Sequence, residues 1–184
     1  MILLLSAVIF VLILPYIRFI FKRVALFCRI KNICRKHNLI LLPRHFFWFL
    51  GNTCGEQADF MIETPREIFS VKLCGVFFRK QLFNFIDSEH YSVKELQFQI
   101  KCYMHGINYV VKQKKPYNLR AGYSGEKEVI PIILMNPIAM TVTKSTGTSK
   151  EPVANGDYVN EGYFYNCSGF CDRLKEKREL LLYS

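Results

Sequence analysis

The sequence predicts an α+β protein, with an N-terminal transmembrane helix followed by a mixed, β-rich domain. Three observations support this prediction. An uncharged apolar run opens the chain from Met1 to Ile17. Several runs beyond Asp59 alternate between apolar and polar residues, which is typical of half-buried strands. A segment from Gly169 to Leu182 has apolar residues on one side and charge on the other, which favours a final helix.

The opening run is long enough to serve as a membrane anchor. Phe19, Ile20 and Phe21 extend it past Arg18, so we expect the anchor to cover residues 1–21. About 20 mostly apolar residues cross the hydrocarbon core, and roughly 17 are the minimum. A cleaved signal peptide would need a basic start and a small-x-small cleavage site, and the sequence has neither feature. We therefore expect an uncleaved anchor.

A run of basic residues follows the anchor. The first 55 residues contain eight Lys/Arg and no Asp or Glu. They are Arg18, Lys22, Arg23, Arg29, Lys31, Arg35, Lys36 and Arg44. Because flanks rich in Lys and Arg stay in the cytoplasm, we expect a cell-membrane protein with its N-terminus outside and its C-terminal domain inside. Seven cysteines without a CxxC pair agree with a reducing compartment.

The net charge of +10 belongs mainly to this basic collar. Beyond residue 55 the charges nearly balance, with 17 Lys/Arg against 15 Asp/Glu. We expect the collar to attract anionic lipid headgroups, at about 1 kcal/mol per basic residue near the surface. The remainder lacks the strongly basic surface of a dedicated nucleic-acid binder. The expected partners are therefore the membrane and a protein of unknown identity, and nucleic acid has only weak support.

Residues 22–50 are expected to form a basic, amphipathic juxtamembrane segment. There is no Gly or Pro from Arg18 to His37, and apolar residues recur at spacings of three and four, which predicts a continuing helix. This stripe comprises Ile17, Ile20, Phe21, Val24, Phe27 or Cys28, and Ile30 or Cys34. It fits a helix that lies on the bilayer or one that packs on the domain. Residues 39–50 likewise fit either the membrane interface or the core.

The loop residues Gly51–Gly55 predict the start of a single cytoplasmic domain, residues 51–184. Within it we expect a series of strands, a mobile loop at 144–157, and a final helix capped by Ser168. The strands are expected at 59–63, 68–73, 82–86, 96–101, 129–135 and 138–143, and residues 90–94 either extend the strand at 82–86 or begin another. Cys167 and Cys171 lie one helical turn apart but lack further ligands at the spacing of a zinc site.

The first two strands predict a hairpin with a two-residue turn at Pro65 and Arg66. Positions whose numbers add to the same total then face each other: Asp59 with Lys72, Met61 with Ser70, and Glu63 with Ile68. Side chains alternate between the faces of a strand. The hairpin therefore places Asp59, Met61, Ser70 and Lys72 on one face.

With Gly55-Glu56 just upstream, this hairpin resembles the PD-(D/E)xK phosphodiesterase superfamily, and its nuclease-related-domain branch in particular. In that branch a helix carries a Gly-Glu pair, a strand carries Asp, and the next strand carries Glu-x-Lys. Gly55-Glu56, Asp59 and Ser70-Val71-Lys72 match these elements, and Val129–Met135 matches a later core strand. The resemblance covers residues 51 to 140 and implies a restriction-endonuclease-like core.

The resemblance implies Glu56, Asp59 and Lys72 as catalytic residues, with Asp59 and Glu56 as the metal ligands. Carboxylates suit Mg²⁺, which activates a water molecule, and the lysine stabilises developing negative charge. This chain departs from the motif because Ser70 stands at the position of the second carboxylate. Glu63 lies about 13 Å from Asp59 along the strand. Glu56 is therefore the better substitute.

Three functional hypotheses follow. The first is a catalytically degenerate domain that acts in binding or scaffolding at the membrane and needs no cofactor. The second is a membrane-tethered, Mg-dependent nuclease. The third is a lipid-surface protein that acts through its basic helix. Without any catalysis, Asp59 and Lys72 would form a cross-strand ion pair on a wet face, worth under about 1 kcal/mol.

Overall fold

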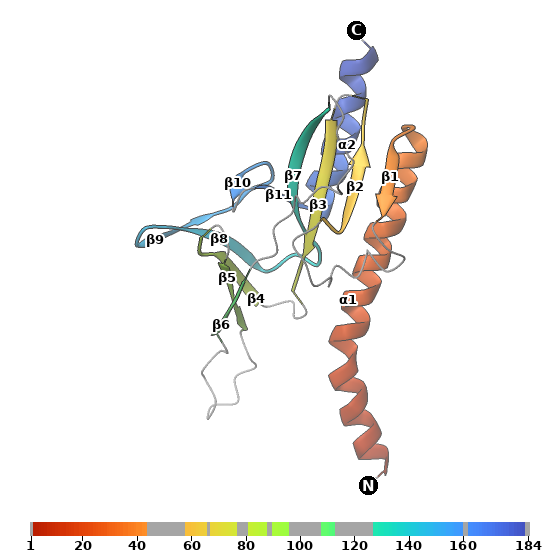
Figure 1. The fold of residues 1–184 in the computed structure, drawn as a ribbon. Helices are drawn as coiled ribbons and strands as arrows, with labels where there is room; N and C mark the ends of the chain where they lie inside the picture. Colours follow the sequence, from red (N-terminus) through yellow and green to blue (C-terminus); the bar gives the residue numbers. More distant parts are fainter. Residues whose placement is uncertain are drawn as a thin grey trace.

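The computed structural model describes most of the chain, in ranges separated by gaps. Backbone is described for residues 2–43, 58–65, 67–76, 81–87, 90–95, 108–112, 127–159 and 162–182. The side chains of residues 2–12, 43, 90, 95, 108–112 and 177–182 lie outside the description. Figure 1 shows two helices, α1 (Ile2–Lys36) and α2 (Cys167–Leu182), with strands arranged in two sheets. The α+β class predicted from the sequence is therefore confirmed.

The first sheet has six strands in the order β1-β2-β3-β7-β11-β10. Their bounds are β1 Ile40–Pro43, β2 Phe60–Glu63, β3 Glu67–Cys74, β7 Glu128–Met135, β10 Tyr158–Val159 and β11 Gly162–Asn166. The sheet is mixed, because β3 and β11 run parallel to β7 while the other neighbours are antiparallel. Pro131 precedes Ile132, where pairing with β11 begins, so β7 is locally an edge there on that side.

The second sheet has five strands in the order β6-β5-β4-β8-β9. Their bounds are β4 Gln81–Phe85, β5 His90–Glu95, β6 Asn108–Lys112, β8 Thr141–Thr146 and β9 Ser149–Pro152. All five strands belong to the two connections between the parallel strands of the first sheet. β4, β5 and β6 lie between β3 and β7, and β8 and β9 lie between β7 and β11. The parallel pairing of β4 with β8 joins the two connections.

Both helices cover one face of the first sheet (Figure 1). The main core cluster lies between them and the sheet. It contains Leu26, Ile30, Ile33 and Cys34 of α1, Phe60, Ile62, Phe69, Val71, Leu73, Ile132 and Leu134 of the sheet, and Phe170, Cys171 and Leu174 of α2. On the opposite face, Ile133 and Met135 of β7 pack with Phe83 and Phe85 of β4. The alternating faces of β7 therefore contribute to two separate clusters, and Ala58, Met61 and Ile68 form a third.

The N-terminal part of α1 exposes apolar side chains, and its C-terminal part buries one face. The buried face consists of Arg23, Leu26, Ile30, Ile33 and Cys34, at helical spacing. The large apolar residues that precede it are exposed: Ile13, Leu14, Tyr16, Ile17, Ile20, Phe21 and Val24. The stripe expected from Ile17 to Cys34 is exposed in its first half, whereas the sheet packs against the helix face that carries Leu26, Ile30 and Ile33. Among the residues whose side chains the structure describes, which begin at Ile13 in α1, no helix has the length and apolarity needed to cross a membrane.

Packing crosses the boundary that the sequence placed at residue 51. β1 pairs with β2 from Ile40↔Glu63 to Pro43↔Phe60. The C-terminal half of α1 contributes four residues to the main core cluster. A fragment that began at residue 51 would therefore lose one strand of the sheet and part of its core.

The expected mobile loop at residues 144–157 is wrong, because most of this segment is a hairpin. β8 and β9 pair from Thr143↔Pro152 to Thr146↔Ser149. Gly147 has a φ of 64° in the connecting turn, a conformation that glycine adopts without steric cost. The residues typical of turns build one tight turn between the partly buried strand β8 and the exposed strand β9.

The final helix begins earlier than expected, and its cap is a different residue. α2 starts at Cys167, and the Gly169 N–H donates a 2.9 Å hydrogen bond to the Asn166 side chain. Asn166 is therefore the N-cap in place of Ser168, since asparagine is a favoured capping residue. The expected strand at 96–101 lies outside the described residues.

Candidate functional site

The hairpin that carries the candidate site has the predicted register. Met61 pairs with Ser70 and Glu63 pairs with Ile68, and β2 and β3 are joined by a short turn. This register begins at Phe60↔Val71, and the N–H of the preceding Asp59 donates a 2.8 Å hydrogen bond to the carbonyl of Val71. Asp59 lies close to Lys72, with 3.6 Å between Lys72 Nζ and Asp59 Oδ1.

This ion pair is buried, so the expectation of a wet surface pair is wrong. Asp59 is 0% exposed and Lys72 is 4% exposed. The second carboxylate oxygen, Asp59 Oδ2, accepts a 2.7 Å hydrogen bond from the Leu73 N–H. Charged groups removed from water need such partners, because solvation no longer stabilises them. Asp59 is thus held by both the backbone and the side chain of the neighbouring strand.

A third charged residue, Arg23, joins the site from α1 and was not anticipated. It is 2% exposed, and its Nη2 donates a 2.8 Å hydrogen bond to the carbonyl of Cys74. Its guanidinium carbon lies 4.9 Å from the ring centroid of Phe19. Burial lowers the pKa of Arg23 to about 10, and nearby Cys74 and Asp59 oppose this change. Arg23 therefore remains positively charged at neutral pH.

Asn136 provides a second link between the sheet and the helix. It follows β7 directly, and its side-chain amide donates a 2.8 Å hydrogen bond to the carbonyl of Lys22. At the end of β3, a Cβ on Gly75 would lie 2.5 Å from the carbonyl oxygen of Asn136. The ends of β3 and β7 therefore meet α1 at residues 22 and 23. We call Arg23, Asp59, Lys72, Cys74 and Asn136 the helix–sheet junction.

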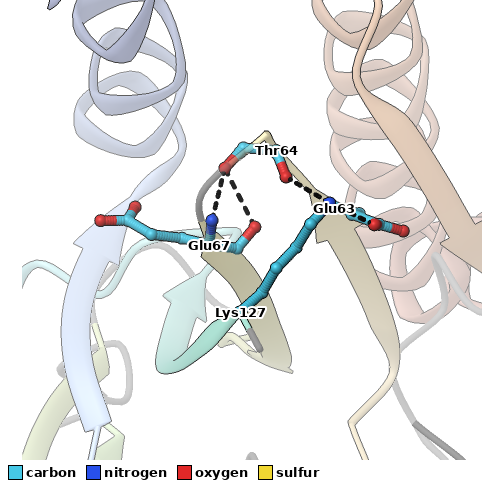
Figure 2. Close-up of polar contacts among 4 residues, drawn as sticks. All are labelled: Glu63, Thr64, Glu67 and Lys127. Carbon is cyan, nitrogen blue, oxygen red and sulfur yellow. Dashed lines mark hydrogen bonds and ion pairs between the residues drawn. The ribbon is translucent and has the colours of Figure 1, made fainter. Parts of the chain in front are cut away.

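Of the two glutamates considered as metal ligands beside Asp59, Glu63 lies elsewhere and Glu56 lies outside the described residues. Ser70 is buried on β3 at the position of the missing carboxylate. Glu63 lies at the opposite end of β2, where Lys127 donates hydrogen bonds to its carboxylate and to the carbonyl of Thr64 (Figure 2). Glu56 lies outside the described residues. Among those that are described, no three His, Cys, Asp or Glu residues gather as a metal site.

The junction has the chemistry of a structural connection. Lys72 pairs with the Asp59 carboxylate, a second cation, Arg23, lies nearby on α1, and all three side chains are almost fully buried. A phosphodiester substrate would have to reach Asp59 through this packing, and Asp59 Oδ2 is already engaged by the backbone. Sequence reasoning identified the pair but missed Arg23, whose only signal is its position three residues before Leu26 on the buried helical face.

Two thiols at the start of α2 form a separate polar cluster. Cys167 is partly exposed, Cys171 is buried, and both are free. A hydrogen bond from Cys171 lowers the pKa of the Cys167 thiol to about 6, although burial opposes this change, and Arg29 of α1 adds to the lowering. The pKa of Cys171 is raised by the same hydrogen bond and by burial.

Comparisons with known proteins found no relative from which a function could be transferred. No protein-family model matches the chain. Searches of curated proteins and of solved structures also found no match. The functional conclusion therefore depends on the packing, burial and charge described above.

Proposed function

We propose that this chain is a single-pass membrane-anchored protein whose cytoplasmic domain serves in binding or scaffolding and has no catalytic role. The observation that carries the proposal is the continuity of α1. One helix of 35 residues begins in the uncharged opening run and ends packed in the core of the domain. At about 1.5 Å per residue, it is roughly 50 Å long. Anchor and domain therefore share one element.

The exposed half of α1 supports the membrane as its surroundings. Phe21 is 69% exposed, Ile20 is 46% and Leu14 is 46%. Leaving a large apolar side chain in water forgoes about 1.5–3 kcal/mol of burial free energy, and contiguous exposed apolar surface marks contact with a partner or a membrane. Residues 1–17 carry no charged side chain. The basic residues that follow favour an N-terminus outside and a cytoplasmic domain.

A non-catalytic role fits the helix–sheet junction. Asp59 and Lys72 are buried, and a serine replaces the second carboxylate of the nuclease motif. Two features support a restriction-endonuclease-like ancestry for the first sheet. Asp59 and Lys72 lie together on a hairpin, and β7 runs parallel to β3 as the later core strand. In this proposal the old catalytic pair has become part of the attachment between sheet and anchor helix.

Membrane attachment can be tested by placing charge on the exposed face of α1. The full chain should remain in the membrane fraction after alkaline carbonate washing. The triple change Leu14→Glu, Ile17→Glu and Phe21→Glu should release it, because ionised carboxylates are costly in hydrocarbon. Thr148→Glu, in the exposed turn between β8 and β9, is the control and should change nothing. A wild-type chain that washes free of membranes would contradict the proposal.

The non-catalytic role can be tested with the full chain in detergent. We expect no Mg²⁺-dependent cleavage of single- or double-stranded DNA or RNA, and no rise in melting temperature on adding Mg²⁺. Lys72→Met serves as the matched variant, since it removes the proposed catalytic lysine. Cleavage by the wild-type chain that disappears in folded Lys72→Met would establish the nuclease alternative.

A further inference from the structure

We propose that Cys167 and Cys171, beside Arg29 of α1, form a peroxide-reactive dithiol. In this pair Cys167 is the attacking thiolate and Cys171 is the thiol that resolves the product. Both cysteines lie at the start of α2, and both are free. The reaction would occur whether or not α1 enters a membrane, so the proposal does not depend on the proposed function.

Helical spacing brings the two sulfur atoms together. Residues four apart lie on the same face of a helix, with about 6 Å of rise between them. The side chains of Cys167 and Cys171 are joined by a hydrogen bond. Cys171 is 0% exposed and belongs to the main core cluster, whereas Cys167 is only partly buried. One thiol of the pair is therefore open to a small solute, and the other is screened from it.

The surroundings of the pair favour one thiolate and one thiol. The hydrogen bond from Cys171 contributes most to lowering the pKa of Cys167 to about 6, and burial opposes the change. Arg29 adds a hydrogen bond and its charge, and Lys22 adds charge. The same hydrogen bond and burial raise the pKa of Cys171, against the charges of Arg29 and Lys175. At neutral pH Cys167 is therefore largely ionised, while Cys171 keeps its proton.

Hydrogen peroxide is an oxidant that suits this arrangement, because it is small, neutral and attacked by thiolates. Thiolate character and solvent access decide which cysteine it oxidises. The Cys167 thiolate attacks one peroxide oxygen, and the O–O bond breaks. The departing hydroxide takes a proton from solvent and becomes water, which leaves Cys167 as a sulfenic acid.

Cys171 then completes the reaction. Its sulfur attacks the sulfenic sulfur of Cys167, the S–O bond breaks, and the departing hydroxide takes the Cys171 proton to form a second water. The two cysteines lose two electrons and become a disulfide, and the peroxide gains these electrons as it becomes two waters. Glutathione, as a small thiol, can restore both cysteines by thiol–disulfide exchange and is itself converted to its disulfide.

The disulfide would deform the start of α2. Cβ atoms four residues apart in a helix are separated by about 5–6 Å, whereas a disulfide brings them to about 4 Å. The start of a helix can adjust, because its first N–H groups have no partners within the helix. A strained disulfide is easily reduced, so the oxidation should be reversible. Because Phe170 and Cys171 pack in the main core cluster, oxidation also alters the packing of α2 on the sheet.

Peptide mass spectrometry of the full chain in detergent, after limited treatment with hydrogen peroxide, tests the proposal. We expect a bond between Cys167 and Cys171 to form before Cys28 is oxidised, and dithiothreitol to reverse it. Cys28 is the internal comparison because it is an exposed thiol on α1, and exposure alone would make it react first. Oxidation of Cys28 ahead of Cys167 would overturn the proposal, as would oxidation of Cys167 without a bond to Cys171.

Cysteine variants test the order of the two steps. In Cys171→Ser, a sulfenic acid should persist at Cys167, where dimedone traps it. Cys171→Ala serves the same purpose should the buried hydroxyl of serine unfold the chain. In Cys167→Ser, Cys171 should stay reduced at the same peroxide concentration, because it is buried and protonated. Oxidation of Cys171 in that variant would contradict the proposed order.

Arg29→Ala tests whether α1 contributes to the site. At about pH 5, where the thiolate is the minor form, alkylation of Cys167 by iodoacetamide should slow about threefold to tenfold, which corresponds to raising the thiol pKa by about half to one unit. Arg29 is exposed, so the fold should persist. Lys31→Ala is the matched control, since residues two apart on a helix do not face the same side, and it should leave the rate unchanged. Equal rates in the two variants would contradict the proposed cluster.

Discussion

The two ends of the β2–β3 hairpin hold the same chemistry in different surroundings. At one end Lys72 faces Asp59, and these side chains are 5% and 0% exposed. At the other end Lys127 faces Glu63, with 33% and 20% exposure. Figure 2 shows the second end, where Thr64 also closes the turn onto Glu67. The lysine–carboxylate pair is therefore buried at one end of the hairpin and partly exposed to solvent at the other.

The difference follows from what covers each pair. The Asp59 end meets α1, whose Arg23 adds a second buried cation and a bond to the carbonyl of Cys74. The Glu63 end lies at the turn, where water reaches the charged groups. A buried charge depends on its partners far more than an exposed one, because water cannot replace them. Mutations at the two ends should accordingly differ in magnitude.

The largest effect is expected for Asp59→Ala. It leaves Lys72 buried without its ion-pair partner and removes a nearby negative charge from Arg23, which should lower the free energy of unfolding by about 3–5 kcal/mol. Chemical denaturation of the full chain in detergent measures the change. Glu63→Ala is the matched control at the other end. Equal losses in the two variants would remove the distinction between the two pairs.

A double variant tests whether the loss of stability in Asp59→Ala comes from the unpaired charge of Lys72. Replacing both partners, Asp59→Ala with Lys72→Met, removes the uncompensated cation and should recover part of the stability lost in Asp59→Ala. Recovery is expected to be incomplete because Arg23 remains. A double variant less stable than Asp59→Ala would show that Lys72 contributes through packing rather than charge.

Gly75→Ala should be the next most damaging change. The new Cβ would lie 2.5 Å from the carbonyl oxygen of Asn136 and 2.9 Å from the backbone nitrogen of Pro137. Backbone must shift to relieve such contacts, at a cost of about 1–3 kcal/mol. Thermal unfolding of the full chain reports the effect. A stability unchanged from wild type would indicate that the backbone at the end of β3 can shift without a cost in free energy.

Thr64→Ala probes the turn end at intermediate strength. The Thr64 hydroxyl accepts a 3.0 Å hydrogen bond from the Glu67 N–H and donates one of 2.9 Å to the Glu67 carbonyl. Losing these local bonds should lower the unfolding free energy by about 1 kcal/mol. Thr64→Ser retains the hydroxyl and should stay near wild type, whereas a loss as large as that of Thr64→Ala would point to the methyl group instead.

Glu63→Gln should have the smallest mutational effect. Partly exposed ion pairs contribute about 0.2–1 kcal/mol and weaken as salt screens them. The difference in stability between wild type and Glu63→Gln should therefore shrink between low and high salt. A difference that is large and independent of salt would mean that this end is as dry as the Asp59 end.

High pH offers a final test of burial at the Asp59 end. Burial raises the pKa of the Cys74 thiol from about 9 to about 12. Its contribution to stability is present below the unfolded value and is lost as the pH rises through the folded one, since only the unfolded state releases the proton between them. Wild type should thus lose more stability above pH 9 than Cys74→Ser. The free energy of unfolding, measured at several pH values, reports the difference. If the stability of the two proteins fell in parallel with pH, the raised pKa of the Cys74 thiol would be contradicted.

The hairpin was predictable because a local rule fixes it. A two-residue turn sets the register of two alternating strands, and Asp59 and Lys72 follow from it. The burial of Arg23 was not predictable, because nothing in the sequence distinguishes it from the exposed basic residues around it. Only the tertiary packing of α1 on the sheet decides which of these side chains leaves water.

The second sheet shows the same limit. Alternation identified β4 and β5 nearly at their observed bounds, but a strand pattern does not specify its partner. β4 pairs with β8 from Leu82↔Thr141 to Phe85↔Lys144, across more than fifty residues of chain. Such pairings arise from the global fold rather than from local sequence.

The main core cluster draws on two helices that are far apart in the sequence. Residues 26–34 of α1 meet Phe170, Cys171 and Leu174 of α2 on the same face of the sheet. During translation this face must therefore stay open until α2 has left the ribosome. Newly made chains would expose its apolar surface throughout synthesis, and premature termination before residue 170 would yield a product that chaperones and proteases recognise as unfinished.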